Sequence, residues 1–72
     1  MEGFHVIVAV DRGLEDTGRR VNVDVLAASR LDAAIIAEGF VNNALAGNEY
    51  AHASAINQIT SNRPGPSMAM AA

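Results

Sequence analysis

One stretch of the sequence, from Ser29 to Gly47, is expected to form the only long helix of this chain. Ser29 can accept a hydrogen bond from an early helical N–H group, and Asp32 complements the positive end of the helix dipole. Gly47 is well placed to end the helix in a left-handed conformation. Most residues between them favour or tolerate a helix, with Gly39 as the exception. The rest of the fold must therefore be arranged around a single helix.

The apolar residues of this helix fall on two sides when they are placed at about 100° per residue. One broad arc is expected to face the core. Leu31 and Ile35 lie on the far side of a narrow polar strip. They are either scattered surface residues, which are common, or a second contact with a partner subunit or the C-terminal tail. The core arc comprises Ala33, Ile36, Ala37, Phe40, Val41 and Ala44, with Leu45 at its edge.

Two segments before the helix are predicted to be strands, residues 4–11 and 21–28, because β-branched residues alternate in both. The face that carries Phe4 should meet the helix. The opposite face still carries Ile7 and Leu26 among polar residues. The charged connection between the strands, residues 11–20, is either a binding loop or a solvated turn, and we prefer the turn.

The segment 48–60 is compatible with a strand or with a helix, and its periodicity does not decide between them. A third strand would complete a sheet, so we prefer the strand. The predicted fold class is then α+β, with a small antiparallel sheet in ββαβ order and one helix packed on one face. Residues 1–60 would form this single domain.

Residues 61–72 are predicted to form a C-terminal tail, because Pro64 and Pro66 exclude a helix or a central strand there. Met68 and Met70 are flexible apolar residues that could anchor the tail. No basic leader and no run long enough to span a membrane is visible in the sequence. We therefore expect a cytoplasmic protein that does not contact membranes.

The size of the chain predicts self-association. A domain of 72 residues has a thin core, and no cysteine is present to support it through a disulfide. Oligomerisation is the remaining source of extra burial. The formal net charge of −3 argues against binding to nucleic acid, which normally requires a basic patch. We expect a homo-oligomer formed by edge pairing or by packing of sheet faces.

No motif in the sequence indicates catalysis. His5 and His52 could share a sheet face with Asp24 or Asp11, but their spacing has no zinc-site pattern. The serines have no nucleophile motif around them, and the glycines form no phosphate-binding loop. We predict a protein that is not an enzyme, with no cofactor and no metal site.

The segment VNVDVLAASRLDAAIIAEGFV, which joins the second strand to the helix, resembles small orphan accessory proteins of actinobacterial phages. All five basic residues are Arg and alanine is abundant, as in proteins from GC-rich genomes. The resemblance covers residues 4–59 and implies no active-site residues. It implies a protein that acts by binding host proteins, defence systems or a particle, in the host cell cytoplasm.

These observations lead to a functional hypothesis and two alternatives. The hypothesis is a non-enzymatic protein-binding module, a phage accessory protein that engages a host or defence protein. The alternatives are a structural component of a phage particle, where the partner is a virion protein, and a small-ligand binder with a pocket at an oligomer interface. The residues expected to form the interaction surface are Ile7, Leu26, Leu31, Ile35, Met68 and Met70.

Overall fold

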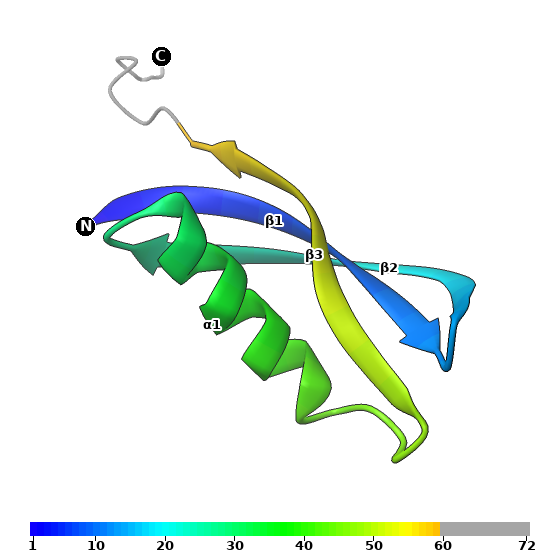
Figure 1. The fold of residues 1–72 in the computed structure, drawn as a ribbon. Helices are drawn as coiled ribbons and strands as arrows, with labels where there is room; N and C mark the ends of the chain where they lie inside the picture. The colour runs from blue at the N-terminus through cyan, green and yellow to red at the C-terminus, as the bar shows by residue number, and fades with distance from the viewer. Residues whose placement is uncertain (60–72) are drawn as a thin grey trace.

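The computed structural model describes residues 1–59, in which one helix packs against one face of a three-stranded antiparallel sheet (Figure 1). The strands are arranged in the order β2-β1-β3, so β1 is central. The predicted α+β fold in ββαβ order is confirmed, including the strand that we preferred for the ambiguous segment. The elements are β1 (Glu2–Arg12), β2 (Glu15–Ala27), α1 (Arg30–Asn42) and β3 (Glu49–Gln58).

The core lies between the central strand and a row of small residues on the helix. Alternate residues of β1 point to the helix, because successive side chains of a strand face opposite sides. None of the four largest is more than 2% exposed. The helix contributes mainly alanines to this contact, which lets its backbone come close to the sheet. The residues concerned are Phe4, Val6, Val8 and Val10 of β1, with Ala33, Ala37 and Val41 of α1.

The hairpin between β1 and β2 is tighter than the charged connection expected from the sequence. The two strands continue to Arg12 and Glu15, so only Gly13 and Leu14 form the turn. Gly13 has a φ of 62°, which suits glycine at the first position of a two-residue hairpin turn. Sequence patterns missed these strand ends because the segment is polar and lacks the alternation of apolar residues that marks a strand.

The helix begins as predicted but ends before Gly47. Ser29 caps it and accepts a hydrogen bond from the Asp32 N–H at 3.2 Å. Its last residue is Asn42, so the predicted stop at Gly47 is wrong. The side-chain Oδ1 of Asn42 accepts a hydrogen bond from the Ala51 N–H of β3 at 2.8 Å. This contact fixes the end of the helix beside the strand, and the chain then turns away to enter β3.

A row of polar side chains on α1 covers the outer edge of β3. Glu38 Oε2 accepts a hydrogen bond from the Ala53 N–H at 2.6 Å. Arg30 donates to the Ile56 carbonyl oxygen at 2.9 Å. Glu38 and Asn42 are four residues apart and share one side of the helix, and Arg30 reaches the same strand from the first turn. They satisfy backbone groups that an edge strand otherwise leaves open to pairing.

The position of these polar side chains explains why part of the predicted core is wrong. Ile36 and Phe40 were expected to face the sheet, but they are 46% and 67% exposed. Directing the polar row at β3 turns the helix about its axis, so that the residues nearest the sheet are Ala37 and Val41. Ile36 and Phe40 are thereby moved to the side of the helix that overhangs β2.

Replacing Glu38 by Ala should destabilise the fold, because the Ala53 N–H loses its partner in a partly buried position. We expect a loss of about 1–3 kcal/mol in the free energy of unfolding, the usual cost of leaving such a donor unsatisfied. Urea unfolding measures this loss. Amide hydrogen exchange by NMR should show faster exchange at Ala53 in the variant.

The matched control is Glu38→Gln, which keeps an oxygen acceptor and should retain most of the stability and the slow exchange of Ala53. Equal stability of Glu38→Ala and the wild type would show that the helix does not protect this edge.

Candidate interaction surface

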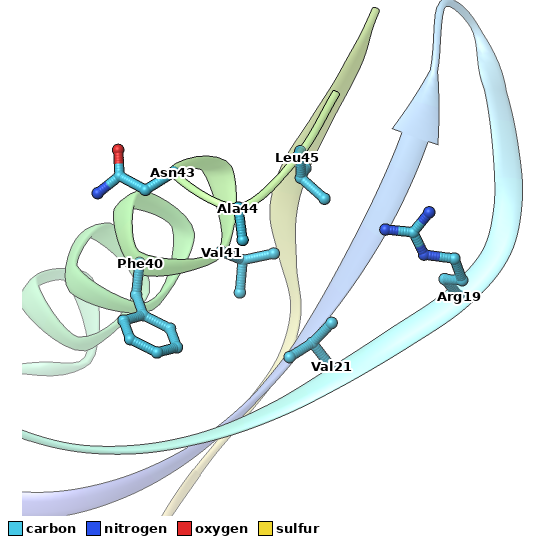
Figure 2. Close-up of a pocket in the computed structure, with 7 residues that line it drawn as sticks. All are labelled: Arg19, Val21, Phe40, Val41, Asn43, Ala44 and Leu45. Atoms are coloured by element: carbon cyan, nitrogen blue, oxygen red, sulfur yellow. The ribbon is translucent and has the colours of Figure 1, made fainter. Parts of the chain in front are cut away.

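An open apolar groove runs between α1 and β2, with a volume of about 430 Å³. Figure 2 shows Phe40 and Val41 pointing from the helix toward the strand, with Val21 below them. We call this feature the α1–β2 groove. The residues that line it are Arg19, Val21, Phe40, Val41, Asn43, Ala44 and Leu45.

The groove exists because a short helix is displaced from one edge of a long sheet. Both α1 and β2 contain 13 residues. The helix is therefore about 20 Å long, whereas the strand extends over about 43 Å. Since the helix is held against β3, the helix-facing side chains of β2 are covered only in part. Val21, Val23 and Val25 are half-buried, although they lie on the core side of the sheet.

A network of ion pairs closes one end of the groove. Arg19 and Arg12 both contact Glu49, at 3.3 and 2.9 Å, and the Glu49 side chain is 6% exposed. The hydrogen bond from Arg12 lowers the pKa of Glu49, with further help from the charge of Arg19. The guanidinium of Arg19 is thus engaged by a carboxylate, and the remaining groove residues offer no nucleophile or proton-transfer group.

The outer face of α1 carries a second apolar pair. Leu31 is 70% exposed and Ile35 is 58% exposed, so both remain on the surface as expected. They are four residues apart and therefore adjacent on the helix. The polar strip that includes Asp32 and Asn43 separates them from Phe40 and the groove.

The far face of the sheet does not bring Ile7 and Leu26 together. Leu26 is 67% exposed and pairs with Gly3 of β1, whereas Ile7 is half-buried and pairs with Asn22. His5 lies between these two positions. Its Nδ1 contacts Asp24 Oδ1 at 2.6 Å, and its Nε2 contacts Asn22 Oδ1 at 3.1 Å. A polar cluster therefore separates the two apolar side chains.

The six residues expected to form one surface thus lie in several places. Leu31 and Ile35 share the outer face of the helix, while Leu26 and Ile7 lie apart on the opposite side of the sheet. Met68 and Met70 lie outside the described residues. Sequence analysis missed Ile36 and Phe40 as surface residues. No local pattern identifies them, because their exposure depends on the contacts that Arg30, Glu38 and Asn42 make with β3.

Each histidine is bound by one carboxylate, not by a metal-site cluster. His52 Nδ1 contacts Asp11 Oδ2 at 2.8 Å, in addition to the His5–Asp24 pair. Within residues 1–59, no three His, Cys, Asp or Glu side chains gather as they would around a metal ion. The described part of the chain also holds no helix with the length and apolar character needed to cross a membrane.

Comparisons with known proteins do not assign the chain to a family: no family model, curated protein or solved structure matches it. The function must therefore be argued from the chemistry of its own surfaces. These are an apolar groove, an apolar outer helix face and a sheet face with a polar centre.

His5 should titrate above the ordinary histidine value. The hydrogen bond to Asp24 raises the pKa of His5 above 6.5, and the hydrogen bond to Asn22 raises it further. Both ring nitrogens face oxygen atoms, which suits the protonated imidazole. Its contribution to stability should be complete below pH 6.5 and be lost as the pH rises through the folded pKa. An NMR titration of the His5 ring measures the midpoint.

The control for this titration is Asp24→Asn, which removes the charge and should lower the His5 midpoint toward 6.5. A wild-type midpoint at or below 6.5 would contradict the structural account of this cluster.

Proposed function

We propose that this chain is a non-enzymatic protein-binding module that uses α1 as its contact element. One observation carries the proposal. Among the large apolar side chains of the helix, Val41 alone is buried. The other four are Leu31, Ile35, Ile36 and Phe40, which are between 46% and 70% exposed.

The four exposed apolar side chains of the helix are not needed to hold it against the sheet. Ala33 and Ala37, together with Val41, already bury the helix against the sheet. Clustered apolar residues on a small protein usually mark a contact with another protein. Apolar residues four apart along a helix, such as Leu31 and Ile35, are the usual anchors of a helix that lies in a partner's groove.

The chemistry of the groove supports binding over catalysis. Its one ionisable side chain, Arg19, is already paired with Glu49. The partner that we propose is a protein of a bacterial host or of its defence systems. The resemblance of residues 4–59 to actinobacterial phage accessory proteins supports this choice.

The proposal predicts that loss of the outer helix face abolishes binding. The tagged protein and the double variant Leu31→Ser/Ile35→Ser would be used to capture proteins from an actinobacterial lysate, followed by mass spectrometry. A partner recovered with the wild type should be reduced at least about tenfold with the double variant, because both helix anchors are lost.

The matched control is Leu14→Ser, which removes a fully exposed leucine from the hairpin turn. It should bind as the wild type does. Equal loss with both variants would indicate non-specific adhesion. Recovery of the chain alone, without any other protein, would overturn the proposal of a separate protein partner.

A further inference from the structure

The outer edge of β2 is uncovered, in contrast to the outer edge of β3. β2 lies at one side of the sheet, and among residues 1–59 no other strand pairs with that side. The polar row of α1 reaches only β3. A long uncovered edge is a template for pairing with another chain.

The contacts of β3 show which residues of β2 direct their backbone groups outward. The Ala53 N–H points away from β1 toward the helix, and Ala53 lies opposite Val8. Along an antiparallel strand the backbone N–H and C=O groups of successive residues point to opposite neighbours. Because Val8 makes no such bonds with Ala53, its N–H and C=O groups point toward β2, where Val8 lies opposite Val21. Every second residue of β2, counted from Val21, therefore faces β1. The residues between them present N–H and C=O groups to the uncovered side: Arg20, Asn22, Asp24 and Leu26.

The side chains of these outward-facing residues form a charge pattern that complements itself. Arg20, Asn22 and Asp24 follow one another along one face of the strand as positive, neutral and negative. If a second copy pairs antiparallel with its Asn22 opposite Asn22, each Arg20 lies opposite an Asp24. Opposite charges in directly facing positions stabilise a strand pair.

Other registers lose this match. Centring the pair on Arg20 or on Asp24 places like charges opposite one another, which is destabilising. Centring it on Val21 or Val23 leaves both charges without an opposite charge. A slip by one residue would turn the wrong backbone groups to the interface.

From this self-complementarity we infer that the occupant of the β2 edge is a second copy of this chain, bound in this register about a two-fold axis at Asn22. The dimer joins the two sheets into one continuous sheet, with both helices on the same face. The inference deepens the proposed function, because it names the partner for the groove side of α1.

The α1–β2 groove is placed to join the same interface. Val21 lines the groove and neighbours Asn22 on the axis, and the exposed Phe40 overhangs it (Figure 2). In the paired register each Val21 lies opposite a Val23, so the half-buried valines of both strands form a continuous apolar strip. The second copy therefore covers the apolar side chains that α1 leaves exposed above β2.

Existing contacts already orient the two charged side chains on the far face of the sheet. Arg20 binds both oxygens of Asp16 at 2.8–2.9 Å, which leaves other guanidinium donors for a second carboxylate. Asp24 contacts His5 through Oδ1 and keeps Oδ2 for an incoming guanidinium. The hydrogen bonds with Asp16 raise the pKa of Arg20, so the guanidinium stays protonated.

Charge reversal tests the register directly. Analytical ultracentrifugation at micromolar concentration should show the wild type at twice the 7.5 kDa of one chain. Arg20→Asp places carboxylates opposite Asp24 at both symmetric positions, and Asp24→Arg places guanidinium groups opposite Arg20. Each single variant should dissociate at a concentration at least about tenfold higher, since two favourable pairs become two unfavourable ones.

The decisive step is to mix the two single variants, because each chain then carries the charges that the other lacks. The mixture should form a one-to-one heterodimer, and the chain with both substitutions should dimerise alone. Circular dichroism of each variant establishes that it is folded. A monomeric wild type, or folded single variants that stay apart when mixed, would overturn the inference.

Failure of this inference is distinguishable from failure of the proposed function. The dimer test uses the purified chain and residues of β2, whereas the capture test uses Leu31 and Ile35 on the other side of the polar strip. A monomer that still captures a protein through those residues keeps the proposed function and removes only the dimer.

Discussion

The hydrogen bond from the Ala53 N–H to Glu38 determines much of this structure, because it sets the rotation of α1 about its own axis. With Arg30 and Asn42, it directs the polar side of α1 to the backbone of β3. The core-facing side chains of β1 are then fully buried, whereas Val21, Val23 and Val25 of β2 stay half-buried. The groove and the exposed Phe40 follow from this placement, and β2 is left as the uncovered edge.

Two kinds of contact stabilise the fold, apolar burial and hydrogen bonds from the helix to β3. The valines and Phe4 of β1 supply apolar burial, and the alanines of α1 let the helix come close enough to use it. The polar row supplies hydrogen bonds at positions where a lost partner is costly. A chain of 72 residues has little further apolar area to bury internally. The apolar side chains above β2, with Phe40 67% exposed, are therefore surface that another chain could cover.

Local patterns predicted the elements, whereas non-local contacts decided how they meet. Strand alternation and the Ser29 cap were visible in the sequence because each depends on neighbouring residues. The rotation of α1 was not, because a helical wheel treats Glu38 as a solvent-facing residue and cannot show that a strand edge needs its carboxylate. For the same reason Ile36 and Phe40 were assigned to the core. The α1–β2 groove depends on that rotation, so no pattern in the sequence alone could reveal it.

The different treatment of the two sheet edges also limits the size of the proposed assembly. Once two copies join through β2, the outer strands of the combined sheet are both β3, and α1 already covers these edges with Glu38 and Asn42. Within residues 1–59 no uncovered strand edge remains for a third copy, so pairing closes at two chains instead of continuing into a fibre. Leu31 and Ile35, on the outer face of each helix, stay accessible in that assembly. Two copies would then present two identical apolar pairs on one face, which would strengthen binding to any partner that carries two sites.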